Sequence, residues 1–310
     1  MLIITGSIAY DYIMDFPGKF GDHIMPDKIH NINLSFIVSK FERRCGGVAG
    51  NISYNLGLLN THHTLFSYAG KDFEEYKKHL EKNGVSTKNV LIDHKVHTAT
   101  GFAMADNTHN QIWGYFYGAA DNNARLKLNS IGKQGDLVFV GPTGAKGSMC
   151  MVKQCIKSKT EYIFDPGFIL TEVTNEDLEL GVTHANIIVG NDYEITLIKR
   201  RVKKWKSLFK DKIVITTLGA KGAQIESSGE LIKIKPIKPK KVVDPTGAGD
   251  AWRAGFLAGY QRGFDLKTCG QMGSVASTYA IENYGTQEHY FTTDQFKNRY
   301  RQNYKTMLNL

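Results

Sequence analysis

The sequence predicts an α/β fold in which a central, mostly parallel sheet is covered by helices on both faces and carries a small β-sheet lid. The first observation is that strand-like and helix-like patterns alternate along most of the 310 residues. The second is that segments 11–45 and 98–117 break this alternation with period-two patterns and turn residues. We expect these segments to form a small antiparallel lid sheet inserted between core elements. Because no change of composition marks a linker, we expect one domain over residues 1–310.

Each expected strand is a short apolar run bounded by glycine, proline, asparagine or aspartate. The core strands are expected at residues 2–5, 63–69, 88–92, 137–141, 162–165, 186–190 and 213–217. Turn residues between paired runs predict two hairpins, 98–105 with 111–117 and 222–227 with 230–234. A longer apolar period predicts helices at residues 46–59, 72–83, 248–262 and 265–283.

The composition, with 42% hydrophobic and 22% charged residues, is typical of a soluble globular protein. No segment approaches the about 18 consecutive apolar residues that a membrane helix needs, and the first residues lack the basic flank of a signal peptide. The four cysteines form no CxxC pair, which disfavours a disulfide framework or a zinc site. We therefore expect a cytoplasmic protein with reduced thiols and no membrane partner.

The chain is basic, with a formal net charge of +9 and an isoelectric point near 9.2. Basic runs at 199–206 and 233–241 contribute to this charge. Such runs can bind nucleic acid, but a solvated helix face and a basic strand-to-loop segment are the favoured interpretation. A basic protein also attracts small polyanions such as ATP. No nucleic-acid partner is expected.

The strongest chemical signal is Asp244-Pro-Thr-Gly-Ala-Gly-Asp250, which is followed at once by an apolar helical run. Three small residues, Gly247, Ala248 and Gly249, open that helix, where free N–H groups and the helix dipole favour an anion. Asp250 lies in the first turn beside this anion site. Taken alone, an aspartate there is an ordinary N-terminal helix residue. Together, the two features supply a phosphate cradle and a carboxylate base, which phosphoryl transfer requires.

Two other nucleotide-binding patterns are missing from the sequence. It contains no GxxxxGK[ST] loop, which excludes a Walker-type phosphate site. It also contains no GxGxxG after a strand with an acidic residue about twenty residues on, which counts against a dinucleotide oxidoreductase.

The stretch 244–250 resembles the C-terminal signature of the ribokinase (PfkB) family of sugar and nucleoside kinases, which usually reads DTxGAGD. Gly46-Gly-Val-Ala-Gly-Asn51 is similar to the family's GGxxxN signature, and Asn191-Asp-Tyr-Glu194 is similar to its NxxE motif. All three motifs occur in the family's order and wide spacing, so the resemblance covers nearly the whole chain. It implies a ribokinase-like three-layer α/β/α fold and ATP-dependent transfer to a hydroxyl group.

Within the family, four segments most resemble bacterial adenosine kinases: residues 6–11, 30–37, 164–167 and 189–194. The resemblance therefore implies that ATP phosphorylates the 5′-hydroxyl of adenosine, giving AMP and ADP. A kinase for another nucleoside or for a sugar such as ribose or fructose remains an alternative. A nucleotide-binding sensor that has lost catalysis is a second alternative.

The resemblance also implies roles for individual residues. Asp250 would be the catalytic base, and the amides of Gly247, Ala248 and Gly249 would hold the charge developing on the γ-phosphoryl group. The acceptor would be bound by Ser7, Asp11, Gly46, Gly47, Asn51 and Asp250. Without the motifs around them, Asp11 would be an ordinary turn residue and Asn51 an ordinary helix residue.

A second set of residues is implied for ATP and cations. Asn191 and Glu194 would position Mg²⁺ through water, as suits a cation that keeps much of its hydration; Glu194 alone would be a surface helix residue. The implied nucleotide contacts are Thr217, Gly219, Gly222, Gly247, Gly249 and Asn283, the last within segment 274–285 near the adenine. Asp244 and Thr246 match positions that hold a monovalent cation in some members, so K⁺ is a further candidate cofactor.

Several residues have no assigned role or have competing interpretations. Pro245 replaces the usual threonine, and Trp252 and Arg253 follow the base where plainer residues are common. The alternating aromatic residues of the second lid segment could cover a nucleoside base, fill the lid core or form a dimer face. These residues are Phe102, Trp113, Tyr115, Phe116 and Tyr117. The resemblance makes a homodimer through the lid plausible.

Overall fold

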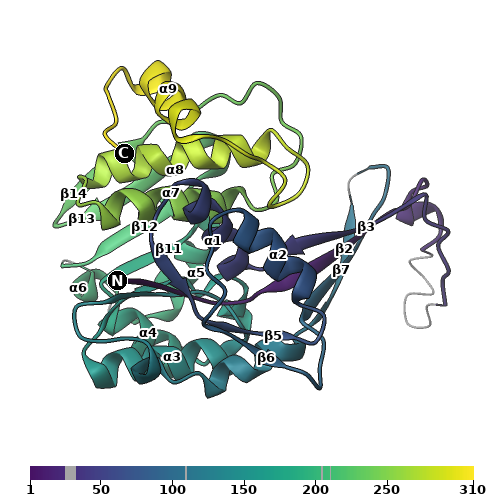
Figure 1. Cartoon of the computed structure of the whole chain (residues 1–310), viewed down its shortest axis with the longest axis horizontal. Coiled ribbons are helices and arrows are strands. Elements are labelled where there is room, and N and C mark those ends of the chain that lie inside the picture. Colours follow the sequence, from purple (N-terminus) through teal and green to yellow (C-terminus); the bar gives the residue numbers. More distant parts are fainter. Residues whose placement is uncertain (25–32, 109, 204, 210) are drawn as a thin grey trace.

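The computed structural model describes residues 1–24, 33–108, 110–203, 205–209 and 211–310. Part of the 30–37 segment therefore lies outside the described residues. An eight-stranded sheet forms the core, in the order β14-β13-β12-β11-β10-β9-β1-β4 (Figure 1). Its strands are β1 (Leu2–Thr5), β4 (His63–Leu65), β9 (Leu137–Val140), β10 (Glu161–Phe164), β11 (Ile187–Asn191), β12 (Ile213–Thr217), β13 (Ala223–Ser227) and β14 (Glu230–Ile234). The strands from β4 to β12 are parallel, whereas β13 is antiparallel to both of its neighbours, β12 and β14, so the expected mostly parallel sheet is observed.

The central strands β1, β9 and β11 are largely apolar because both faces of the sheet are covered. In β1, Ile3 is buried on one face, whereas Leu2 and Ile4 are buried on the other. The same alternation separates Val138 from Phe139 in the neighbouring β9. Successive side chains point to opposite sides of a strand, so each strand contributes to two separate hydrophobic clusters.

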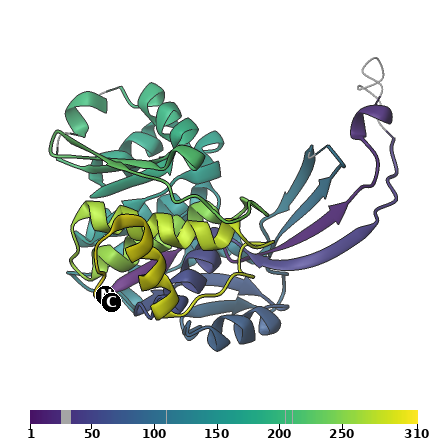
Figure 2. The same ribbon diagram turned by 90° about the horizontal axis from the view of Figure 1, so that it is seen from above.

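Helices form the two outer layers. One face is covered by α1 (Val48–Leu58), α7 (Ala248–Gln261), α8 (Leu266–Ile281) and α9 (Thr293–Tyr304), and the other by α3 (Ala145–Ser158), α4 (Asn175–His184) and α5 (Asp192–Arg201) (Figures 1 and 2). The remaining helices are α2 (Glu74–Lys82), α6 (Trp205–Leu208) and the short 3₁₀ segments η1 (Phe20–Asp22), η3 (Gly118–Arg125), η4 (Leu128–Ser130), η5 (Gly167–Thr171) and η6 (Gly219–Lys221). None of the helices in the described ranges has the length and apolar character needed to cross a membrane.

A second sheet projects from the core, and we call it the lid sheet (Figure 2). Its order is β3-β2-β7-β8, with β2 (Ala9–Asp15), β3 (Lys40–Gly46), β7 (Ala99–Ala105) and β8 (Gln111–Phe116). These strands come from the two segments expected to leave the core. The expected antiparallel pairing is observed within each segment, between β2 and β3 and between β7 and β8, but the two segments join through a parallel β2–β7 pair, so the lid sheet is mixed. The chain returns to the lid only after α1, β4 and α2, and such a long crossover allows parallel entry.

The segment expected as one strand over 63–69 is divided in two. β4 ends at Leu65, and β5 (Ser67–Gly70) leaves the core sheet to pair in parallel with β6 (Val90–Asp93). Phe66 lies between them and donates its N–H to the carbonyl of Ile4 (2.9 Å), so its backbone still follows β1. The strand pattern over 63–69 does not mark this change of partner, because it carries no information about which strand each residue pairs with.

Candidate functional site

Gly247, Ala248 and Gly249 form the turn that starts α7, and we call this turn the anion loop. Gly247 adopts the left-handed conformation (φ 76°), and a Cβ atom there would lie 2.9 Å from Thr286. Among the described residues, the backbone N–H groups of Gly247, Gly249 and Asp250 have no hydrogen-bond partner. The Ala248 N–H instead donates to the carbonyl of Pro245 at 3.2 Å. Gly247 and Gly249 therefore supply freer anion donors than Ala248.

Residues preceding the anion loop tie it to the neighbouring chain. One Asp244 oxygen accepts from the Thr246 N–H (2.9 Å) and the other from the Gly285 N–H (3.0 Å). The Pro245 carbonyl accepts the Ala248 N–H and so completes the turn into α7. Asp244 thus has a structural task, and any cation near it would share oxygens that already accept hydrogen bonds.

Asp250 lies in the first turn of α7 and is held by a residue far away in the sequence. The Asn51 side chain, on α1, donates to the Asp250 carboxylate at 2.8 Å. Burial raises the pKa of Asp250 to about 6, while Arg253 and the Asn51 hydrogen bond oppose that rise. A carboxylate with this pKa is ionised at neutral pH and basic enough to accept a proton.

Asp11, on β2, lies close enough to Asp250 for the two carboxylates to interact electrostatically. Burial, and then the charge of Asp250, raise the pKa of Asp11 to about 6. Gly46 ends β3 directly against Asp11, and a Cβ atom at Gly46 would collide with the Asp11 carboxylate. The motif glycine is therefore needed so that the backbone can approach this carboxylate.

Gly47 and Ser7 fix the point at which α1 begins. Gly47 is the N-cap residue with φ 83°, and a Cβ atom there would lie 2.6 Å from backbone atoms of Ser7 and Ala9. The Ser7 side chain accepts the Val48 N–H at 3.2 Å, and its carbonyl accepts the Ala49 N–H at 3.0 Å. Helix α1 consequently begins at Val48, two residues later than expected, and Ser7 positions it from the β1–β2 turn.

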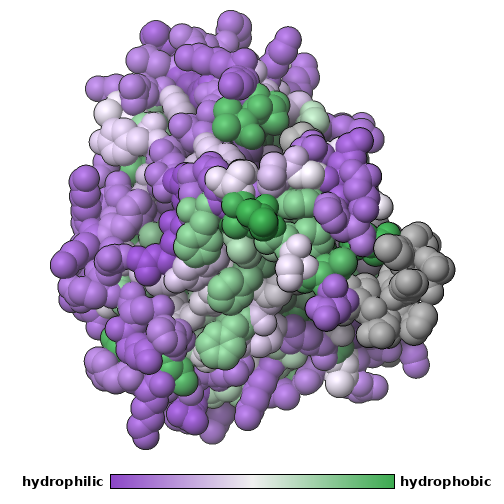
Figure 3. All heavy atoms as spheres, turned by 90° about the vertical axis from the view of Figure 1, so that its right-hand side faces the viewer, coloured by the Kyte–Doolittle hydropathy of each residue, from purple (hydrophilic) through white to green (hydrophobic). Residues whose placement is uncertain are grey.

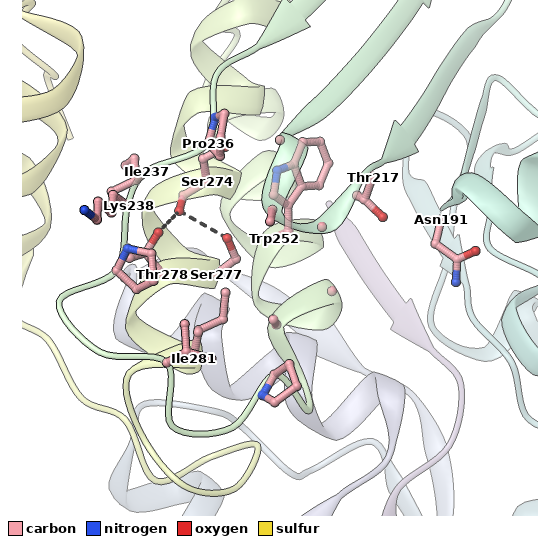
Figure 4. Close-up of a pocket in the computed structure, with 18 residues that line it drawn as sticks. Asn191, Thr217, Pro236, Ile237, Lys238, Trp252, Ser274, Ser277, Thr278 and Ile281 are labelled. Carbon is pink, nitrogen blue, oxygen red and sulfur yellow. Dashed lines mark hydrogen bonds between the residues drawn. The ribbon is translucent and has the colours of Figure 1, made fainter. Parts of the chain in front are cut away.

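A cavity of about 640 Å³ opens beside the anion loop (Figure 4). Thr217, Gly219 and Gly222, after β12, line one side of it together with Asn191. Ala248 and Gly249 line it at the start of α7. Of the expected nucleotide residues, the cavity thus brings together Asn191, Thr217, Gly219, Gly222 and Gly249 from three separate segments, whereas Gly247 and Glu194 are not among its lining residues. The volume suits a nucleotide-sized ligand.

Helix α8 forms another wall of this cavity through Ser274, Ser277, Thr278 and Ile281. The Ser277 and Thr278 hydroxyl groups donate to the Ser274 carbonyl at 3.1 and 2.6 Å (Figure 4). Asn283 is not among the lining residues and donates its side-chain amide to the carbonyl of Tyr279 (2.9 Å). The expected 274–285 wall is thus present in its helical part, whereas Asn283 lies away from the cavity.

Sequence reasoning missed one wall of the cavity. Pro236, Ile237, Lys238, Pro239 and Val242 line it, within and just after the basic run 233–241. The sequence favours a solvated strand-to-loop segment for this run, with nucleic-acid binding as the alternative, and neither interpretation predicts a cavity wall. Its signal was the pair of prolines flanking an isoleucine after the hairpin, because proline favours an extended backbone whose side chains can line a groove.

Asn191 and Glu194 cap the start of α5. The Asn191 side chain accepts the Glu194 N–H (2.8 Å), and the Glu194 carboxylate accepts the Asn191 N–H (2.7 Å). Burial, and next the charge of Asp165, raise the pKa of Glu194. Asp165, Glu194 and Asp250 together carry three formal negative charges against the single positive charge of Arg253. This excess of negative charge fits a divalent cation nearby, held through water because the capping bonds occupy part of both side chains.

Trp252 and Arg253, which had no assigned role, both belong to the site. Trp252 lines the cavity, and its ring packs over Gly273 of α8, where a Cβ atom would lie 2.8 Å from the indole. Arg253 forms a buried ion pair with Asp165, at the end of β10. Neither partner could be identified in advance, because Gly273 and Asp165 are remote in sequence.

Two aromatic rings lie on the side of Asp11, the residue expected to bind the acceptor, and we call this the acceptor side. Tyr115, from β8, is nearly parallel to Phe168, from η5, with ring centroids 6.4 Å apart and an interplanar angle of 6°. The charge of Asp11 contributes to a raised pKa of Tyr115, after burial, so the ring and carboxylate face the same region. Of the expected lid aromatics, Phe102 and Phe116 are instead exposed on the other face of the sheet.

Comparisons with known proteins agree with this geometry. A model of the pfkB family carbohydrate kinases matches residues 17–293. A nucleoside kinase from Methanothermobacter thermautotrophicus is 33% identical over 294 residues, which cover 92% of this chain and 91% of that protein.

Solved structures are similar over almost the whole chain. Burkholderia thailandensis nucleoside kinase in complex with inosine has a TM-score of 0.88 at 31% identity and covers 99% of both chains. The same protein in complex with ADP-inosine has a TM-score of 0.86 at 32% identity, covering 99% of this chain and 97% of that chain. Methanocaldococcus jannaschii nucleoside kinase, an archaeal member of the ribokinase family, has a TM-score of 0.86 at 26% identity, covering 97% of this chain and 98% of the other. The predicted three-layer fold is therefore confirmed.

Proposed function

The chain belongs to the pfkB family of carbohydrate kinases and is a phosphotransferase with a hydroxyl acceptor, and from this premise we propose that it transfers the γ-phosphoryl group of ATP to the 5′-hydroxyl of a nucleoside, with adenosine as the first candidate. The observation that carries the proposal is the Asn51–Asp250 hydrogen bond of 2.8 Å. It fixes a carboxylate base between the anion loop and the acceptor side. We treat residues 1–310 as one kinase domain that includes the lid.

The proposed reaction assigns one task to each group at the site. The 5′-hydroxyl gives its proton to Asp250 as its oxygen attacks the γ-phosphorus in line, and ADP leaves. The N–H groups of Gly247 and Gly249 stabilise the charge on the transferring group because they are free donors at the N-terminus of α7. Asp11 binds the ribose hydroxyls, since a carboxylate can accept two neighbouring hydrogen bonds. Ser7, Gly46 and Gly47 set the backbone against which the sugar lies.

ATP is proposed to occupy the 640 Å³ cavity, with its phosphates toward the anion loop and its base toward α8. The related Burkholderia kinase in complex with ADP-inosine supports a nucleoside triphosphate as donor. Mg²⁺, when bound near Asn191 and Glu194, would neutralise charge on the β- and γ-phosphates. K⁺ remains a proposal at Asp244 and Thr246, where the two carboxylate oxygens already accept backbone N–H groups.

A nucleoside is favoured over a free sugar by the aromatic pair on the acceptor side. A planar base can contact the rings of Tyr115 and Phe168, whereas a sugar offers no flat π surface. Relatives named nucleoside kinases, one of them solved in complex with inosine, support the same class. Inosine is therefore the main alternative to adenosine as the acceptor, because the two nucleosides share the ribose and differ only in the base.

The lid sheet is also proposed to join two copies of the chain. Tyr12, Phe41, Phe102, Ile112 and Phe116 lie on the face opposite Asp11, according to the strand register. Tyr12 stacks on Phe41 and Phe102, and the last four residues are exposed. Figure 3 shows hydrophobic side chains gathered on the end of the molecule from which the lid sheet projects. A second copy would cover them, as extended exposed apolar faces mark interaction sites.

The proposal is tested with a panel of acceptors in the presence of ATP and Mg²⁺. Adenosine, inosine, guanosine, cytidine, ribose and fructose are compared by kcat/KM, and formation of the 5′-monophosphate is followed directly. We expect adenosine to be preferred and both sugars to be poor acceptors. A preference for inosine would correct the base assignment alone. A preference for fructose or ribose over every nucleoside would refute the nucleoside class.

The Asp250→Asn variant separates an active kinase from a nucleotide-binding sensor. Loss of the general base is expected to lower kcat by roughly 10²–10⁴-fold. ATP binding, measured by calorimetry, should persist because the cavity is unchanged. Asp294→Asn, at the start of the remote helix α9, serves as the matched control and should leave kcat unchanged. Unaltered turnover in Asp250→Asn would contradict the proposed mechanism.

A further inference from the structure

Arg253 is a buried cation located one helical turn after the base. Its Nε donates to Asp165 Oδ2 at 2.5 Å, and its Nη2 donates to Asp165 Oδ1 at 3.2 Å, so the ion pair is bidentate. The side chain of Arg253 is only 9% exposed, and that of Asp165 only 2%. A planar guanidinium matches a carboxylate in this geometry and is held in one orientation by it.

The rest of the guanidinium faces the reaction site. Nη2 lies 3.9 Å from Glu194 Oε2, and a Cβ atom at Gly249 would lie 3.0 Å from Nη1. Arg253 follows Asp250 by three residues on α7, so both side chains share one face of the helix. One fixed guanidinium therefore lies within 4 Å of the carboxylate proposed for Mg²⁺, leaves little room for a side chain at Gly249 of the anion loop, and shares a helix face with the proposed base.

The charge balance explains why this position needs arginine. Three carboxylates, those of Asp165, Glu194 and Asp250, face the guanidinium from β10, α5 and α7. Without a fixed positive charge, carboxylates brought this close would repel one another. Asp165 uses two of the N–H groups, so the remaining donors stay directed at the other two segments.

We propose that Arg253 is a positioning residue for phosphoryl transfer: clamped by Asp165, it fixes the anion loop at Gly249 and is the shared counter-charge of Asp250 and Glu194. Arg253 touches neither substrate in this arrangement and acts through these neighbours. The inference rests on the proposed kinase reaction, because the affected step is transfer to the acceptor hydroxyl. It predicts a defect in kcat and not in binding.

The decisive variant removes the ion pair as a whole. Arg253→Met alone would leave Asp165 buried without its partner, and this variant could fail to fold. The double variant Asp165→Asn/Arg253→Met carries no uncompensated buried charge at the pair. We expect it to fold with a melting temperature within a few degrees of wild type, to keep KM for both substrates within about threefold, and to lose on the order of 10²-fold in kcat.

Two further variants distinguish positioning from support of the fold. Arg253→Lys keeps the charge but cannot form the bidentate ion pair, so its kcat should lie between those of wild type and the double variant. Arg262→Met is the matched control, because Arg262 is the partly buried arginine at the other end of α7 and binds Thr61 and Leu59. It should lower stability and leave kcat unchanged.

The outcomes separate this inference from the proposed function. A wild-type protein with no activity on any acceptor would refute the proposed function itself. An active wild type with a double variant whose kcat is within threefold of it would refute the role of Arg253 alone. A loss of kcat in Arg262→Met as large as that in the double variant would also overturn the role, because the effect would then reflect loss of any arginine from α7.

Discussion

Asp250 is an aspartate in the first turn of a helix, a position at which aspartate is favoured for reasons unrelated to catalysis. Its chemistry comes from its surroundings. Asn51 orients one oxygen at 2.8 Å, and burial raises the pKa to about 6. Asp11 has a pKa of about 6 as well, and part of that rise is due to Asp250. The two carboxylates therefore titrate as an interacting pair.

A pH profile of kcat/KM tests this pair. Both carboxylates must be ionised, Asp250 to accept a proton and Asp11 to bind the ribose hydroxyls. We therefore expect kcat/KM to fall as the pH drops through about 6, with a slope steeper than one proton. In Asp11→Asn, the acid limb should become a one-proton step at lower pH, on a lower plateau. An acid limb near pH 4 in the wild type would contradict the assignment.

The same pKa values predict an opposite trend for stability. Each folded-state pKa lies above the unfolded value of 3.8, so the folded chain binds these protons more tightly. Their contribution therefore favours folding below about pH 4 and is lost as the pH rises through about 6. Asp250→Asn should thus melt no lower than wild type at pH 8, which distinguishes its loss of activity from unfolding.

At the scale of elements, the close packing of α7 on α8 shapes the nucleotide cavity. Trp252 of α7 and Ser274 of α8 both line the cavity, and Gly273 lies beneath the indole. A Cβ atom at Gly273 would lie 2.7 Å from the Trp252 carbonyl and 2.8 Å from its ring. The glycine is therefore required by contact between two helices and not by its own dihedral angles.

Gly273→Ala tests this contact. The added methyl group must separate α7 from α8, and such overpacking costs about 1–3 kcal/mol. We expect a lower free energy of unfolding in urea and a higher KM for ATP, because two walls of the cavity shift together. Gly21→Ala is the matched control, since a Cβ atom at Gly21 would meet no other atom within 4 Å. If Gly273→Ala and Gly21→Ala had the same free energy of unfolding, the contact between α7 and α8 would leave room for a methyl group, and the prediction would be wrong.

At the scale of the whole molecule, the two faces of the lid sheet differ in character. Asp11, the proposed acceptor-binding residue, lies on one face, and Phe102 lies on the other, exposed with Phe41, Ile112 and Phe116. A lid that dimerises on its outer face while it covers an acceptor on its inner face would also exclude water from the reaction.

Sedimentation of the intact chain tests the proposed dimer. We expect a species of twice the 34.7 kDa chain mass, with Phe102→Lys shifting the population to monomer because a charge would be buried at the interface. Tyr290→Lys, at an exposed aromatic residue outside the lid, is the control and should remain dimeric. A wild-type protein that sediments as a monomer at micromolar concentration would contradict the dimer.

The sequence predicted the core sheet because strands buried on both faces are continuously apolar and the helices between them follow a longer period. It predicted the motif residues because glycines at helix starts have a local cause, visible at Gly47 and Gly247. It did not predict the parallel β2–β7 pairing, since alternation within a strand carries no information about the direction of its partner.

By itself, therefore, the sequence determined the fold class and pointed to the proposed anion loop and the proposed base, because each of these depends on neighbours in the chain. Only the tertiary structure decided which distant groups complete the site. Asn51 reaches Asp250 across 199 positions, and Asp165 reaches Arg253 across 88. Such pairs form when packing of the sheet and helices brings remote segments together, and charge and hydrogen bonding between those segments leave no periodic trace in the sequence.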